Sequence, residues 1–258
     1  MLRTRDLDYD LPEELIATPP AAATTGQRDQ ARMLVVPRDT PCQTAESLQD
    51  RVVRDLPSLL HEGDLLVMNA SSVLPARLVG SKVPPGQRTS DEGGRVEGLY
   101  LRTIQGNPEE PARWCVLLRG GRLKTGTRID LLGPRGRHRL RLTLLDRPGS
   151  EGEGAVPWIA LVQPAPDSMD LGEPSSWLSL IGHTPIPSYI LKRRAHADAP
   201  SLPGDLGDDD RSWYQTVYAR VPGSLAAPTA GLHFTSDLLK QLDSAGVRRT
   251  EVLLHVGL

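Results

Sequence analysis

A series of short β-type runs between residues 78 and 162 constrains the fold more than any other feature of the chain. Glycine, proline and charged residues separate the runs, and this spacing is typical of a small barrel or a sandwich. The chain has 24 glycines, 23 prolines and one phenylalanine, so turns are abundant and Leu, Val and Ile must fill the core. The runs are Arg77–Gly80, Arg95–Leu101, Arg113–Leu118, Arg128–Leu132, Leu140–Leu145 and Pro157–Val162.

The residues before this series predict both strands and a helix. Arg32–Val36 is a short apolar run followed by Pro37, which predicts a strand. Glu46–Leu60 carries leucine and valine at largely helical spacing, interrupted by Pro57. Leu65–Met68 follows a Gly-Asp turn and predicts a buried strand. Such an alternation of strand and helix is typical of an α/β domain.

A helix and a last strand are predicted near the C-terminus. Thr235 or Ser236 can cap the helix, and Gly246 ends it. Thr250–Val256 then predicts a strand that is buried on both faces and needs a neighbour to cover it. The apolar face of the helix consists of Leu238, Leu239 and Leu242.

Composition excludes several classes of protein. No apolar run approaches the roughly 20 residues of a membrane span, and Met1–Asp6 lacks the apolar core of a signal peptide. Cys42 and Cys115 lie far apart and indicate neither a disulfide framework nor a metal site. We therefore expect a cytoplasmic protein without a metal ion. The net charge of −2 gives no overall attraction to nucleic acid, so any RNA contact needs a local basic patch.

Tyr214–Phe234 is the least generic segment. Tyr214–Tyr218 alternates as a strand does, and a Pro-Gly turn follows it. Ala226–Gly231 consists of small or backbone-special residues, which let another molecule approach the main chain closely. His233 comes next, just before the predicted helix, where an imidazole can transfer protons. The alternative is a tight connection in which His233 is a half-buried packing residue.

Motifs in one order along the chain resemble a single family, the S-adenosylmethionine:tRNA ribosyltransferase-isomerases of queuosine biosynthesis. The similarity extends from near Asp6 to the last residue, and so many ordered motifs make it specific. The motifs are Asp8–Ala17, Gly63–Val67, Leu74–Leu78, Gly182–Pro187, Tyr189–Ile190, Tyr214–Ala219, Ala226–Phe234 and Leu254–Gly257.

The resemblance implies a fold and an activity. The expected fold is an α/β main domain with a mixed sheet, made of residues 1–77 and 164–258, and an inserted small antiparallel β-barrel domain of residues 78–163. The expected reaction moves the ribosyl part of S-adenosylmethionine onto 7-aminomethyl-7-deazaguanine in the wobble position of tRNA. Adenine and methionine leave, and an epoxycyclopentanediol results. The expected protein is a monomer that binds the anticodon stem-loop and no membrane.

Two histidines are the catalytic candidates. His233 is the first choice for proton transfer and His183 the second, because imidazole titrates near neutral pH. Each can instead be structural, with its ring bonded to backbone. The candidates for binding S-adenosylmethionine are Thr229, Ala230, Gly231 and Asn69.

The family has an arginine where this chain has Ser72, after Asn69 at the end of a predicted strand, so one anionic contact of the family is missing here. The candidates for binding RNA combine basic and aromatic residues, which suit a groove that follows phosphates and stacks bases. An exposed basic surface without a partner is the alternative. These candidates are Arg77, Lys124, Lys192, Arg193, Arg194, Tyr214 and Gln215.

The familiar members of the family continue beyond the motif at Leu254–Gly257, so we expect this chain to lack their C-terminal part. An inactive fragment that at most binds tRNA or S-adenosylmethionine is therefore the alternative function. A regulator that binds S-adenosylmethionine without releasing adenine is a further alternative. We also expect an open apolar face or sheet edge beside Val252–Val256, because nothing in the sequence follows to cover it.

Overall fold

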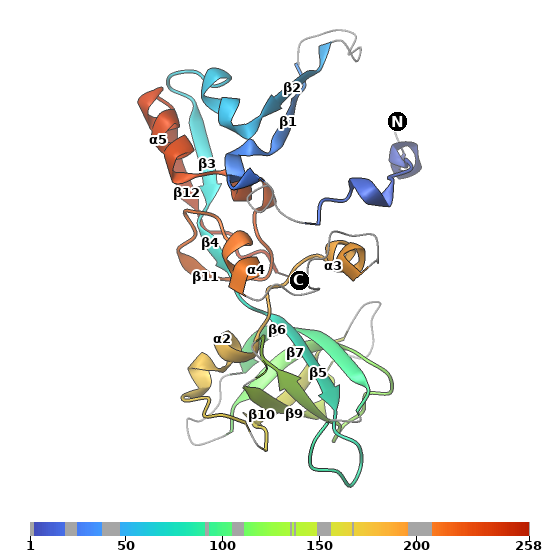
Figure 1. Ribbon diagram of the computed structural model, residues 1–258. Coiled ribbons are helices and arrows are strands. Elements are labelled where there is room, and N and C mark those ends of the chain that lie inside the picture. Colours follow the sequence, from blue (N-terminus) through green and yellow to red (C-terminus); the bar gives the residue numbers. More distant parts are fainter. Residues whose placement is uncertain are drawn as a thin grey trace.

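A closed antiparallel barrel forms the lower half of the molecule in Figure 1. The computed structural model describes residues 3–18, 25–37, 47–90, 93–104, 111–134, 136, 138–148, 156–166, 168–195 and 208–257. Neighbouring strands in the barrel follow the order β10-β7-β6-β5-β8-β9. The strands are β5 (Arg77–Lys82), β6 (Arg95–Ile104), β7 (Arg113–Arg119), β8 (Arg128–Leu132), β9 (Arg139–Asp146) and β10 (Trp158–Pro164).

Alternation along the strands fills the barrel interior. In β9, Leu140, Leu142 and Leu144 are fully buried, as expected for residues two apart on one face of a strand. A helical turn covers one end of the barrel, since Trp177 and Ile181 belong to the same buried cluster as the barrel leucines. That turn is α2 (Trp177–Ile181), preceded by the short 3₁₀ turn η6 (Pro174–Ser176). The barrel is therefore the larger hydrophobic core of the protein.

The α/β part lies above the barrel in Figure 1 and contains three two-stranded sheets among the described residues. The pair β1–β2 is antiparallel, whereas β3–β12 and β4–β11 are parallel. The predicted class, an α/β domain with an antiparallel barrel, is confirmed, while the sheet is divided into short pieces. The strands are β1 (Arg32–Val35), β2 (Gln49–Val52), β3 (Leu65–Asn69), β4 (Ser71–Val73), β11 (Val221–Ser224) and β12 (Arg248–Val252).

The helices of this part are short. The longest is α5 (Ser236–Ser244), capped by the Thr235 hydroxyl, which accepts a hydrogen bond from the Leu238 N–H. Its apolar face packs on residues of η5 and β3, as the leucine spacing predicts. The other helical elements are α3 (Ser188–Ala195), α4 (Asp208–Trp213), η1 (Thr4–Leu7), η2 (Glu13–Leu15), η3 (Arg28–Gln30), η5 (Val53–Ser58) and η7 (Thr229–His233).

Four local predictions are wrong. Thr250–Val256 is not a buried strand, because the last strand is Arg248–Val252, its five residues are exposed, and residues 253–256 lie outside it. Residues 47–60, the described part of the predicted helix, do not form one, because Gln49–Val52 pairs with β1 and Pro57 confines the following residues to a 3₁₀ turn. Tyr214–Tyr218 is not a strand, and the Pro-Gly pair after it lies inside β11 instead of a turn. Strand β3 is not buried, since Leu65 and Val67 are each more than half exposed.

An apolar surface is open beside the last strand. Leu253 and Leu254 have exposed fractions of 51% and 62%, although the backbone there is held. The Asn69 side chain bonds both the N–H and the carbonyl of Leu254, and the N–H of Val256 donates to the Ser224 hydroxyl. The segment after β12 is therefore anchored through its main chain while its apolar side chains face solvent.

Close backbone contacts join the barrel to the α/β part. A Cβ on Gly182 would lie 1.7 Å from the Pro75 carbonyl oxygen, so only glycine fits there. The next residue, His183, forms an antiparallel bridge with Arg77 at the start of β5. Its Nε2 lies 2.9 Å from the Leu132 carbonyl at the end of β8. The chain therefore passes between the two parts at a rigid junction; the domain boundaries at residues 78 and 163 stay a prediction.

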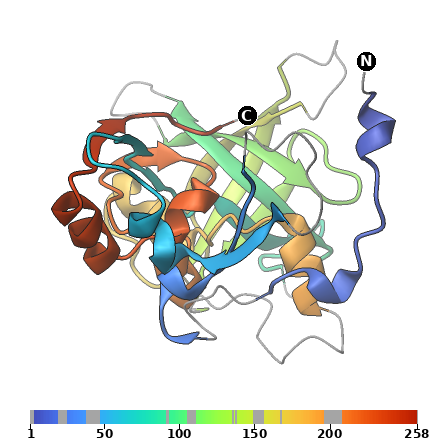
Figure 2. The same cartoon turned by 90° about the horizontal axis from the view of Figure 1, so that it is seen from above.

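Viewed from above in Figure 2, the N-terminal segment runs along the outside of the molecule past α3. Within the described part of the chain, no helix is long and apolar enough to cross a membrane.

Candidate functional site

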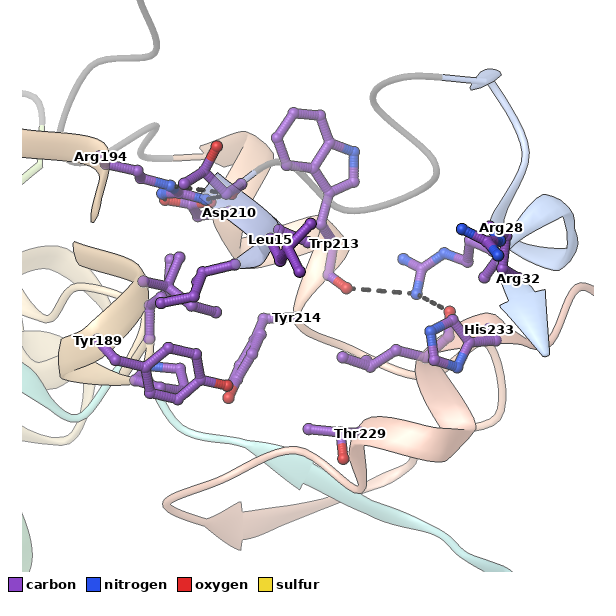
Figure 3. Close-up of a pocket in the computed structure, with 18 of the residues that line it drawn as sticks. Leu15, Arg28, Arg32, Tyr189, Arg194, Asp210, Trp213, Tyr214, Thr229 and His233 are labelled. Carbon is purple, nitrogen blue, oxygen red and sulfur yellow. Dashed lines mark hydrogen bonds and ion pairs between the residues drawn. The ribbon is translucent and has the colours of Figure 1, made fainter. Parts of the chain in front are cut away.

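A cavity of about 770 Å³ lies between the N-terminal segment, η3, α3, α4 and η7. These elements come from widely separated parts of the sequence, and Figure 3 shows their side chains around a common space. Apolar side chains such as Ile186 and Leu232 form much of the wall, and Tyr189, Tyr214, Thr229 and His233 add polar groups. A mostly apolar space of this size with a few polar groups is typical of small-molecule sites.

His233 reaches the cavity from the end of η7. Its Nδ1 lies 3.2 Å from the Ala230 carbonyl oxygen. A carbonyl has no proton to give, so Nδ1 carries the proton in this contact, and the neutral ring then has its lone pair on Nε2. The half-buried imidazole is thus held in the tautomer that a proton acceptor at Nε2 requires.

Two tyrosines lie opposite His233. Figure 3 shows the hydroxyl groups of Tyr189, from α3, and Tyr214, which follows α4, pointing toward each other. Burial raises the pKa of Tyr214 above its ordinary value, and the nearby Tyr189 raises it further. Tyr214 therefore stays neutral through the physiological range and can donate a hydrogen bond to a ligand.

The small residues of the predicted loop form η7. Thr229 and Ala230 are exposed, and Thr229 lines the cavity, whereas Gly231 is buried. A Cβ on Gly231 would lie 2.1 Å from the Tyr218 hydroxyl oxygen. The glycine is therefore needed for packing against Tyr218, whose ring meets Phe234 edge to face. Of the three expected ligand-binding residues in this loop, Thr229 alone lines the cavity.

Replacing Gly231 with alanine is expected to destabilise the protein by about 1–3 kcal/mol, the usual cost of forcing a methyl group into a packed site. Urea unfolding measures the loss. Removing the hydroxyl in the same background, Tyr218→Phe, should recover part of it. Gly121→Ala is the matched control, because no atom lies within 4 Å of a Cβ there. An unchanged unfolding midpoint for Gly231→Ala would contradict the packing account.

Three expected site residues have structural contacts outside the cavity lining. The ring of His183 is buried and its Nε2 lies within hydrogen-bond distance of the Leu132 carbonyl, a contact of the kind that its structural alternative predicts. Both amide atoms of Asn69 bond the backbone, at Ser71 and Leu254. The Gln215 amide bonds both the N–H and the carbonyl of Val73. These contacts fix neighbouring strands in place.

The basic candidates are scattered. Arg194 was expected to face RNA, but its guanidinium is 3% exposed and pairs with Asp210 at 2.8 Å. Arg77 is also largely buried, with Glu97 3.8 Å away. Lys124 is exposed on the turn between β7 and β8, in the barrel. Lys192 on α3 is exposed and Arg193 beside it is half-buried, next to the exposed Tyr189.

Sequence reasoning missed several residues of the cavity. Arg28 was not singled out, although its guanidinium bonds four backbone carbonyls, in the segment 212–215 and at Leu232. Asp210 was not singled out, although it is 2% exposed and holds Arg194. A lone arginine or aspartate in a polar stretch carries no local signal of a partner far away in sequence. Among the residues that the structure describes, no group of three or more His, Cys, Asp or Glu is placed to hold a metal ion.

The fold is an α/β domain with an antiparallel barrel. The cavity beside His233 is mostly apolar, as is typical of a site for a small molecule. The family model described as "Queuosine biosynthesis protein" matches residues 4–258, and the chain belongs to this family. The sequence resemblance is thereby confirmed.

Two relatives named S-adenosylmethionine:tRNA ribosyltransferase-isomerase are similar over 99% of this chain. One from Caulobacter sp. (strain K31) is 40% identical, and one from Mesorhizobium japonicum is 38% identical. The chain spans 61% of the length of each of these relatives. A solved S-adenosylmethionine tRNA ribosyltransferase from Thermotoga maritima is 26% identical, with a TM-score of 0.31, over 97% of this chain and 58% of that one.

Proposed function

We propose that this chain acts in the transfer and isomerisation of the ribosyl moiety of S-adenosylmethionine onto 7-aminomethyl-7-deazaguanine at the wobble position of tRNA. The products are epoxyqueuosine-tRNA, adenine and methionine. Membership of the family over residues 4–258 carries this proposal, and the names of the relatives support it. S-adenosylmethionine is the ribosyl donor and is consumed as a substrate, and no metal ion takes part.

The cavity is the proposed site for the donor. Its apolar walls suit the uncharged parts of S-adenosylmethionine, and the exposed Thr229 offers a hydrogen bond to ribose or carboxylate. The neutral Tyr214 hydroxyl supplies one more donor. Because the sulfonium group is itself positively charged, it activates the adjacent carbon without help from a metal.

His233 is the proposed general base. With Nδ1 bonded to the Ala230 carbonyl, Nε2 can accept the acidic proton beside the sulfonium sulfur. The same nitrogen, once protonated, can return a proton to departing adenine. One imidazole would thus serve both proton transfers, which is consistent with its place at the edge of the cavity.

The proposed RNA contact is α3. Tyr189 lines the cavity and offers a ring for stacking, and the exposed Lys192 and half-buried Arg193, one helical turn further along α3, offer charge for phosphates. A flipped wobble base could then enter beside Tyr189 while the anticodon stem-loop lies across α3. We also propose that the protein is a cytoplasmic monomer.

Adenine release tests the activity. The 258-residue chain is incubated with S-adenosylmethionine and tRNA that carries 7-aminomethyl-7-deazaguanine, and adenine is measured by chromatography. Release with this tRNA and none with tRNA carrying guanine is the expected result. Release that is equal with both tRNAs would overturn the proposal. Binding of tRNA or S-adenosylmethionine without release would instead favour a binding module, the alternative function.

A further inference from the structure

One guanidinium in the cavity wall, that of Arg28, bonds main-chain carbonyls alone among the residues that the structure describes. Nη1 of Arg28 donates to the carbonyl oxygens of Gln215 at 2.7 Å, Leu232 at 3.2 Å and Trp213 at 3.3 Å. Its Nη2 donates to the carbonyl of Ser212 at 2.8 Å. Figure 3 shows Arg28 between Trp213 and the segment that carries His233. A single side chain therefore bonds two segments that lie apart in sequence.

Arg28, which is half-buried, differs from the two buried arginines. Arg141 and Arg194 each pair with a buried aspartate, Asp130 and Asp210. Arg28 makes no ion pair within the described part of the chain, and burial lowers the pKa of its guanidinium below the ordinary value. An arginine remains charged even so, and four carbonyl dipoles compensate it. Arg28 is half-buried, so its charge is partly removed from water without a counter-ion, a cost that a neutral hydrogen-bonding side chain would avoid.

The two segments held by Arg28 carry the polar groups of the cavity. Tyr214 lies between two of the bonded carbonyls, and His233 directly follows a third, that of Leu232. The next residue, Asp29, bonds Arg54 and accepts a hydrogen bond from the Thr235 hydroxyl, which caps α5. The turn η3 thus contacts the chain on both sides of the histidine, at Leu232 and at Thr235.

We propose that Arg28 is the positioning residue of the cavity: its guanidinium sets the distance between Tyr214 and His233 and holds His233 in the Nδ1-protonated form. The functional part of this inference rests on the proposed function. The part that concerns the tautomer of His233 does not rest on it, because the tautomer can be measured without substrate.

The tautomer is measured first. Nitrogen-15 NMR distinguishes protonated from unprotonated ring nitrogens, and His233→Gln assigns the signals of His233. Wild type is expected to show protonated Nδ1 at high pH. Arg28→Gln should shift His233 toward a mixture of both neutral tautomers. Arg211→Gln is the matched control, because Arg211 bonds the carbonyls of Ser179 and Gly182 from α4 and does not line the cavity. An unchanged tautomer in Arg28→Gln overturns the proposal.

Adenine release is measured second, with modified tRNA. Arg28→Gln and Arg28→Lys are both expected to lower kcat about 10²-fold with little change in KM, since a shift of about 1 Å in a reacting group costs that much. Lysine keeps the positive charge, but its ammonium group lacks the forked shape by which the guanidinium bonds carbonyls on two segments. If Arg28→Gln does not fold, Arg28→Lys is measured in its place. Full activity of Arg28→Lys overturns the proposal. Wild type without adenine release overturns the proposed function alone, and the tautomer result still decides the role of Arg28.

Discussion

Asp210→Asn is expected to lower the free energy of unfolding by about 3–5 kcal/mol, the largest stability loss that we predict. Arg194 and Asp210 are each 3% exposed in their side chains and form two hydrogen bonds, at 2.8 and 3.0 Å. Removing the carboxylate charge leaves the guanidinium buried, and within the described residues the Thr18 carbonyl is its remaining acceptor. Urea unfolding followed by circular dichroism measures the change.

Two controls separate burial from charge. The ion pair of Arg32 with Asp50 has side chains that are 86% and 76% exposed, so Asp50→Asn should change stability by less than about 1 kcal/mol. Replacing both buried partners, Arg194→Met with Asp210→Leu, should recover much of the loss, because no uncompensated charge remains. A loss below about 1 kcal/mol for Asp210→Asn would show that water reaches this pair.

This ion pair also affects the cavity. The Thr18 carbonyl that Arg194 bonds belongs to the N-terminal segment, which forms one wall. Without the pair, Arg194 is no longer held by Asp210, so its bonds to the Thr18 carbonyl attach that segment to α3 less firmly. The loss of stability should therefore be accompanied by faster proteolysis near Thr18, whereas Asp50→Asn should leave the cleavage pattern unchanged.

His233→Gln is expected to lower the rate of adenine release by about 10²–10⁴-fold, as the loss of a general base does. Glutamine keeps a polar side chain of similar length but cannot accept a proton at neutral pH. The affinities for tRNA and S-adenosylmethionine, measured by direct binding, should change little, because the imidazole acts on the proton being moved.

His61→Gln is the control for this prediction, since the side chain of His61 is 89% exposed and lies outside the cavity lining. Its rate should equal that of wild type. The opposite pattern, unchanged adenine release with a lower melting temperature in His233→Gln, would give His233 the packing role that the sequence left open. Loss of binding in place of turnover would make it a ligand-holding residue.

Local patterns alone determined the larger part of the fold. The six barrel strands lie where residues of β type recur between turn residues, because each strand buries one face and its own sequence carries that period of two. Helix α5 is likewise set by its leucines, by the cap at Thr235 and by Gly246, whose φ of +80° favours glycine. The loop at Thr229 and the histidine after it were singled out because small residues beside an imidazole are unusual.

The tertiary structure decided what local patterns cannot encode. Arg28 lies 184 to 204 residues from the carbonyls that it bonds, and no periodicity reports a contact of that range. Arg194 looked like part of an exposed basic run, and only the approach of α4 gave it a buried partner. Tyr214–Tyr218 has the composition of a strand, yet the Gln215 carbonyl bonds Arg28 and the Gln215 side chain bonds Val73, so these contacts hold the backbone in a non-strand conformation. Long-range polar contacts thus fixed the site, while short-range apolar periodicity fixed the barrel that lies below it.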